Sequence, residues 1–180
     1  IALGLHANGA LRSRWIHMTD SDVRLPAEYF SASDHTSSSE LNDAVALTYP
    51  FEPVRGEDPA IDEAHTVYEI YLRYYVAALA WAGSPYAFHT IGSTLAVDAH
   101  AYTVVRGVPK RQAGEDFYLL NKLAKVGDVH TLDGAPVRIR GRVSDRVPFG
   151  TGAALKKIRA ALEKGEPTRS YDPRVFDGVK

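Results

Sequence analysis

The chain has 180 residues, 45% of them hydrophobic and 24% charged, which is the composition of an ordinary globular protein. Its formal net charge of -1 provides no global attraction to nucleic acid or to an anionic membrane. Because it has no cysteine, disulfides, thiolate metal sites and a cysteine nucleophile are excluded. This lack fits a reducing compartment.

A membrane-spanning helix is not expected. The longest apolar candidate, Ile61 to Trp81, is interrupted by five charged or histidine side chains, and a spanning helix needs about 20 mostly apolar residues. The first residues also lack the pattern of a secretory signal peptide. We therefore expect a cytoplasmic protein and leave open a peripheral association with the inner face of the membrane. Since the chain starts at Ile1, we expect it to be a fragment, a processed form or a version that omits upstream residues.

Apolar runs bounded by turn residues predict strands, and 3.6-residue periodicity predicts helices. In chain order, the expected strands are Trp15 to Thr19, Asp43 to Tyr49, Ser93 to Val97, Val129 to Leu132 and Val137 to Ile139. The expected helices begin after Pro26 and then cover Ile61 to Ala82, Asp98 to Val105, Glu115 to Lys125 and Ala153 to Lys164. Pro50 to Pro59 is expected to be a loop, and Tyr171 to Lys180 an irregular tail. Strands alternating with helices indicate an α/β fold.

Asp20 and Asp22 directly follow the first predicted strand, in the order Asp-Ser-Asp. Ligands of α/β proteins commonly bind at the carboxyl ends of strands. Carboxylate oxygens are preferred by hard cations such as Mg²⁺ and Mn²⁺, which also bridge to substrate phosphates. A solvated turn after the strand explains the same pair without a ligand.

Glu115 and Asp116 open a predicted helix after Gly114. Acidic residues there interact favourably with the helix dipole, by about 0.3–1 kcal/mol each, which is sufficient to explain them structurally. The functional interpretation is a general base at the mouth of a pocket.

A basic segment, Arg138 to Gly152, contains four arginines followed by a glycine-rich turn. Guanidinium groups suit phosphate oxygens, but alternating arginines also occur on an exposed strand face, and the sequence favours neither explanation. The histidines lack metal-ligand spacing, and His17, inside an apolar strand, is expected to be packed in the core. Basic and aromatic residues do not interleave as a single-stranded nucleic acid would require.

Taken in order, three segments resemble the family 2 glycosyltransferases, whose fold is called GT-A. They are Trp15 to Pro26 (WIHMTDSDVRLP), Gly92 to Val97 (GSTLAV), and Arg106 to Pro109 (RGVP) followed by Gly114 to Leu120 (GEDFYLL). The resemblance spans roughly Trp15 to Gly152. It implies a GT-A-like, Rossmann-like mixed sheet flanked by helices, lacking the N-terminal strands that bind the nucleotide. It also implies a partial glycosyltransferase domain over 1–152, with a C-terminal helix and tail over 153–180.

The resemblance further implies residue roles. A divalent metal, Mn²⁺ or Mg²⁺, is held mainly by Asp22, with Asp20 supporting the metal or the ribose. Asp116, next to Glu115, takes the proton of an acceptor hydroxyl, and sugar transfer from a nucleoside-diphosphate sugar inverts the anomeric carbon. Further substrate or nucleotide contacts are assigned to Gly92, Ser93, Thr94, Arg142 and Arg146.

Two departures from the family pattern concern the donor site. Only 19 residues precede Asp20, where the family has about a hundred that bind the nucleotide base, and no further histidine ligand for the metal is found at the expected place. Two other functions therefore remain open. One is a metal-dependent phosphohydrolase with Asp20 as nucleophile, although Val23 and Arg24 stand where that chemistry expects Gly-Thr or Gly-Val. The other is a non-catalytic GT-A-like binding domain. The oligomeric state, the sugar and the acceptor are not predicted.

Overall fold

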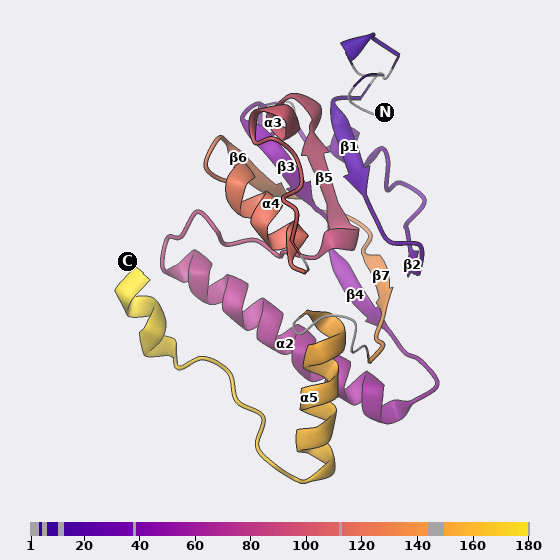
Figure 1. Cartoon of the computed structure of the whole chain (residues 1–180), viewed down its shortest axis with the longest axis vertical. Coiled ribbons are helices and arrows are strands. Elements are labelled where there is room, and N and C mark those ends of the chain that lie inside the picture. The colour runs from indigo at the N-terminus through magenta and orange to yellow at the C-terminus, as the bar shows by residue number, and fades with distance from the viewer. Residues whose placement is uncertain are drawn as a thin grey trace. The chain divides into compact units, whose positions relative to one another are not determined.

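The structure is a computed structural model of the 180-residue chain (Figure 1). It describes residues 4, 7–10, 13–37, 39–111, 113–143 and 150–179. The strands are β1 (Trp15–Met18), β2 (Val23–Arg24), β3 (Ala44–Thr48), β4 (Phe51–Val54), β5 (Leu95–Asp98), β6 (Asp128–Thr131) and β7 (Val137–Arg140). The helices are α2 (Pro59–Trp81), α3 (Ala99–Val104), α4 (Glu115–Leu123) and α5 (Thr151–Glu163), with short 3₁₀ segments η1 (Ala32–His35), η2 (Gly92–Thr94) and η3 (Pro173–Val179).

The chain divides into two compact units. The first contains Ile1–Phe51, Thr90–Arg111 and Glu115–Val137, and the second contains Glu52–His89, Gln112–Gly114 and Arg138–Lys180. The alternation of strands and helices, the mixed sheet and the α/β class agree with the sequence prediction. The expected domain limits at 152 and 153 stay a prediction.

The first unit is built on a four-stranded sheet in the order β1-β5-β3-β6 (Figure 1). β5 runs antiparallel to both of its neighbours, β1 and β3, whereas β3 and β6 are parallel. The strands β1, β3 and β6 therefore point the same way, and their carboxyl ends lie at one edge of the sheet. β5 begins at that edge.

The core of the first unit lies where α4 packs on this sheet. The apolar side chains of the central strands and the inner face of the helix are fully shielded from solvent: Leu47, Leu95, Ala96, Leu119, Leu120 and Leu123 are all 0% exposed. Full burial of one such leucine contributes on the order of 1.5–3 kcal/mol. This packing fixes the position of α4, and so of the acidic residues that begin it.

The second unit is organised by the long helix α2. Asp58 caps its first turn by accepting the N–H of Ala60 at 2.9 Å, and Pro59 follows at a position where a helix tolerates proline. At the other end, Gly83 has φ of 69° and the N–H of Ser84 returns to the carbonyl of Leu79, which is a Schellman motif. The sequence prediction of this helix, and of its end at Gly83, is confirmed.

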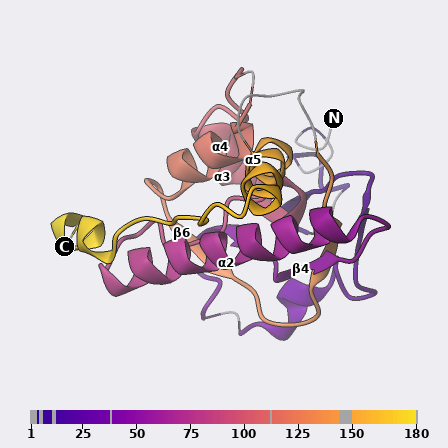
Figure 2. The same cartoon turned by 90° about the horizontal axis from the view of Figure 1, so that it is seen from below.

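α5 packs on the N-terminal half of α2, as Figures 1 and 2 both show. Ala64 of α2 and Leu155 and Ile158 of α5 form the buried centre of this contact. The partly buried Tyr68 and Tyr71 of α2 pack against this centre. In the same unit, the neighbouring strands β4 and β7 are joined by an ion pair between Arg138 Nε and Glu52 Oε1 at 2.6 Å.

Three local predictions are wrong. The residues after Pro26 form turns and then η1 instead of an α-helix, because Tyr29 is drawn into the core at 1% exposure. The expected loop after Pro50 contains the strand β4, which accommodates Pro53. The expected irregular tail contains η3, whose Phe176 is 3% exposed and packs against Leu79 of α2.

Candidate functional site

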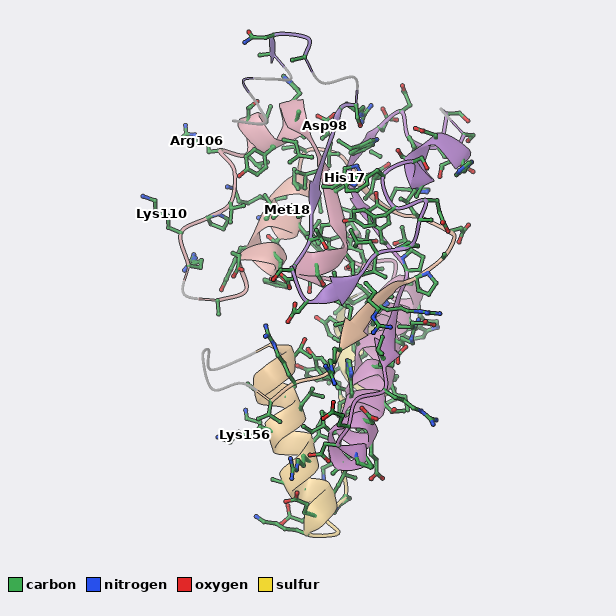
Figure 3. The ribbon with its side chains drawn as sticks, turned by 90° about the vertical axis from the view of Figure 1, so that its right-hand side faces the viewer. His17, Met18, Asp98, Arg106, Lys110 and Lys156 are labelled. Atoms are coloured by element: carbon green, nitrogen blue, oxygen red, sulfur yellow. The ribbon has the colours of Figure 1, made fainter. Side chains whose placement is uncertain are left out.

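The two acidic segments singled out in the sequence lie at the same edge of the four-stranded sheet. Met18 at the end of β1 pairs with Leu95 at the start of β5, so the chain leaving β1 toward Asp20 emerges beside η2. Figure 3 shows the labelled Met18 and Asp98 at opposite ends of this strand pair. η2 contacts both β1 and α4. The strand that leads into Asp20 and Asp22 and the helix that carries Asp116 therefore both contact η2.

Asp20 and Asp22 are both exposed in the turn that follows β1. The chain beyond them is tied back to the sheet by Tyr29, whose hydroxyl donates to the carbonyl of Met18 at 3.2 Å and approaches that of Leu95 at 3.5 Å. This anchor fixes both ends of the segment from Met18 to Tyr29. It holds two carboxylates in solvent at the carboxyl end of a strand, where α/β sheets bind ligands.

A group of aromatic rings supports that anchor. Tyr29 stacks on Tyr49 with ring centroids 4.4 Å apart, and Tyr49 shares a hydrogen bond of 3.1 Å with Nδ1 of His17. Burial raises the pKa of Tyr29 to about 12 and lowers the pKa of His17, so both side chains are neutral at pH 7. His17 is packed as expected. No sequence pattern indicates the tyrosine pair beyond the presence of two aromatic residues near the ends of predicted elements.

Asp116 lies in the first turn of α4, against η2. Its Oδ1 accepts the N–H of Phe117 at 2.7 Å, and the N–H of Gly92 also donates to the carboxylate. A Cβ added to Gly92 would be only 3.2 Å from Oδ2 of Asp116, so the close approach uses the missing side chain of glycine.

Burial raises the pKa of the Asp116 carboxyl above its ordinary value, and the neighbouring charge of Glu115 raises it further, while the backbone N–H groups of Phe117, Gly92 and Asp116 itself act in the opposite direction. In the part of the chain that the structure describes, no basic side chain forms an ion pair with Asp116. A half-buried carboxylate that is held by backbone donors and has a raised pKa is suited to accept a proton. Glu115 is exposed beside it and acts on it through its charge.

Ser93 and Thr94 of the predicted contact set are buried at 3% and 0% exposure. The hydroxyl of Thr94 donates to the carbonyl of Ile91 at 3.0 Å and so closes η2. These side chains support the turn from within. A substrate contact at this turn, which remains a prediction, would come from the half-buried Gly92.

The predicted phosphate-binding arginines belong to the second unit. Arg142 follows β7 and is exposed. Arg146 lies outside the described residues. Their contact with a diphosphate stays a prediction.

The carboxylates of Asp20 and Asp22 meet only part of what a hard divalent cation requires of its ligands. The described residues contain no cluster of three or more histidine, aspartate or glutamate side chains arranged to hold a metal ion. Two exposed carboxylates nevertheless match the way Mg²⁺ is commonly bound, through one or two carboxylates and the phosphates of the substrate. Asp20 and Asp22 therefore fit a metal that arrives with its substrate.

Comparison with known proteins adds no assignment. No protein-family model matches the chain, and no curated protein is significantly similar to it. Each helix in the described residues falls short of the length and apolar character that crossing a membrane requires.

Proposed function

We propose that the chain is the catalytic portion of an inverting glycosyltransferase, which moves a sugar from a nucleoside-diphosphate sugar to an acceptor hydroxyl. The observation that supports this proposal best is that η2 contacts both β1, which leads into the segment of Asp20 and Asp22, and α4, which begins with Glu115 and Asp116. The reaction needs these two functions side by side, one for the diphosphate and one for the attacking hydroxyl. A GT-A-like fold and a cytoplasmic location are parts of the same proposal, the latter supported by the absence of cysteine.

Asp116 is the general base of the proposed reaction. Its carboxylate accepts the proton of the acceptor hydroxyl while that oxygen forms a bond to the anomeric carbon, and the nucleoside diphosphate leaves from the opposite side. Such assistance contributes about 10²–10⁴-fold to the rate. The backbone N–H groups of Gly92 and Phe117 orient the carboxylate, and its raised pKa makes it a stronger base than an exposed aspartate.

The exposed carboxylates Asp22 and Asp20 would hold the divalent cation, Mn²⁺ or Mg²⁺, that neutralises charge on the leaving diphosphate. Their exposure in a turn anchored by Tyr29 leaves them accessible to a ligand from solvent.

The test separates binding from chemistry in the full-length protein. Asp116→Asn is expected to lower sugar transfer by about 10²–10⁴-fold while the Mn²⁺-dependent affinity for UDP or GDP stays within about twofold of the wild-type value. Asp22→Ala is expected to lose that metal-dependent affinity. Calorimetric titration of each nucleotide with and without Mn²⁺, and release of nucleoside diphosphate from a panel of nucleotide sugars, measure the two effects.

Other outcomes would favour the alternatives. If the full-length protein binds neither nucleotide with Mn²⁺ present, the glycosyltransferase proposal is wrong and a non-catalytic binding domain is favoured. If a phosphorylated aspartate is trapped at Asp20, the phosphohydrolase is favoured instead. Equal loss of binding and transfer in Asp116→Asn would give Asp116 a structural role.

A further inference from the structure

Two exposed aromatic residues directly follow Asp116 in the first turn of α4. Phe117 is 48% exposed and Tyr118 is 38% exposed, although both belong to the helix whose other face forms the core. Their rings meet edge to face, with centroids 5.3 Å apart and an interplanar angle of 80°. Phe117 therefore keeps about half of its surface in solvent on the outer face of α4.

The pair is held in place from the side of the α3–α4 loop. The guanidinium of Arg111 lies over the ring of Tyr118, 4.6 Å from its centroid. Nζ of Lys122 donates to the carbonyl of Gly107 at 3.0 Å, which ties this loop to the second turn of α4. Figure 3 shows the labelled Arg106 and Lys110 projecting into solvent from the same loop. The rings are therefore preorganised surface features.

We propose that the exposed ring of Phe117, supported edge to face by Tyr118, is the stacking platform for the acceptor, and that this acceptor is a saccharide. This inference rests on the proposed function, because Asp116 supplies the base that the acceptor hydroxyl needs. The C–H groups on one face of a pyranose ring would lie on the exposed aromatic surface, and the hydroxyl at the ring's edge would reach the carboxylate. The aromatic pair then positions the acceptor and takes no part in proton transfer.

The polarity around the platform favours a saccharide over a hydrocarbon acceptor. The pair is bordered by Glu115 and Asp116 on one side and by Arg111 on the other, and the next turn of α4 continues with the half-buried Asn121. A long alkyl chain would desolvate these charged and polar groups without replacing their hydrogen bonds, which is costly. A sugar has an apolar face for the rings and hydroxyls for the polar border.

The experiment measures saccharide binding directly, without donor and without turnover. Cellobiose, maltose and mannobiose are titrated into the full-length protein, and saturation-transfer NMR identifies the sugar that binds and which of its protons contact the protein. Phe117→Leu removes the ring but keeps an apolar side chain, and it is expected to weaken binding about tenfold, which is the scale of aromatic contacts. Phe117→Trp restores a ring and is expected to retain binding. Val126→Ala is the matched control, because Val126 has the same exposed fraction of 48% but follows the far end of α4.

The outcomes separate this inference from the function on which it rests. Loss of saccharide binding in Phe117→Leu, with the Mn²⁺-dependent affinity for UDP or GDP unchanged, supports the platform. Equal saccharide affinity of Phe117→Leu and wild type overturns it, as does the absence of binding by all three disaccharides in the wild type. Ring-dependent saccharide binding in a protein that binds neither nucleotide would leave the platform in place and overturn the proposed sugar transfer.

Discussion

The two ends of the four-stranded sheet each present an aspartate at a helix start, and the surroundings of the two carboxylates differ. At one end, Asp98 caps α3 by accepting the N–H of Ala101 at 2.8 Å, and its other oxygen pairs with Nε of Arg14 at 2.9 Å. At the other end, Asp116 is held by backbone donors beside the like charge of Glu115. The first carboxylate is stabilised by an opposite charge, whereas the second is destabilised as an anion and so gains basicity.

The presence of a cavity does not by itself identify a functional site, as a cavity near Asp98 illustrates. It has a volume of about 500 Å³ and is lined by Arg14, Asp43, Asp98, His100 and Val126, among others. Its acidic and basic groups already satisfy one another in part, through the pair of Arg14 and Asp98. The candidate site at the other edge is distinguished by chemistry instead, since burial raises the pKa of its Asp116 carboxyl. The predictions below test this contrast, from the largest expected effect to the smallest.

Gly92→Ala should lower sugar transfer about tenfold with little change in the free energy of unfolding. The new Cβ would lie 3.2 Å from Oδ2 and 3.4 Å from Cβ of Asp116, which forces the carboxylate to move by a few tenths of an ångström. Displacements on this scale disturb a reacting geometry, because a misplacement of 1 Å costs on the order of 10²-fold. Nucleotide binding should be retained. Gly178→Ala, at a position with open space around it, is the control, and wild-type activity in Gly92→Ala would contradict the assigned role of Asp116.

Asp98→Ala should lower the free energy of unfolding by about 0.5–2 kcal/mol, the usual cost of losing a helix cap, while sugar transfer by the folded protein stays near the wild-type rate. Asp98→Asn keeps a capping oxygen and loses only the charge, so its cost should be about 0–1 kcal/mol, the value of a partly exposed ion pair. Urea unfolding measures both. If Asp98→Asn abolished sugar transfer without unfolding the protein, Asp98 would also have a functional role, and the proposed difference between Asp98 and Asp116 would be wrong.

Local patterns were sufficient for much of the fold. The apolar run of β1, the 3.6-residue period of α2 and the leucines of α4 each predict an element that the structure contains. β4 was missed because Pro53 argues against a strand, and the turns after Pro26 were missed because their conformation depends on the distant packing of Tyr29 against Tyr49. These errors share a cause, which is that tertiary contacts override local preference.

The candidate site was predictable in its residues but not in its arrangement. Spacing and resemblance predict Asp20, Asp22 and Asp116 as site residues. Their placement at one edge depends on the antiparallel register of β1 and β5, which no local pattern specifies. Ser93 and Thr94, to which the resemblance assigns substrate contacts, have buried side chains, and no local sequence pattern indicates that burial.

The smallest effect should appear in the pH dependence of stability, where Asp116→Asn is compared with the wild type. Because burial raises the pKa of Asp116 in the folded state, the folded protein binds more protons than the unfolded chain between the ordinary aspartate pKa and the raised value. The free energy of unfolding of the wild type therefore falls as the pH rises through this window. Asparagine does not titrate, so the stability of Asp116→Asn relative to the wild type should increase from pH 4 to pH 8.

The same titration should have the opposite effect on activity, because only the ionised form of Asp116 can accept a proton. The acidic limb of kcat/KM should follow the raised pKa and disappear in Asp116→Asn, while the stability of the wild type declines over the same pH range. Urea unfolding and pH–rate profiles on one set of buffers measure both. A relative stability that does not change with pH would mean that the folded protein does not raise this pKa. Asp98 and Asp116 would then differ only in that Asp98 forms an ion pair with Arg14.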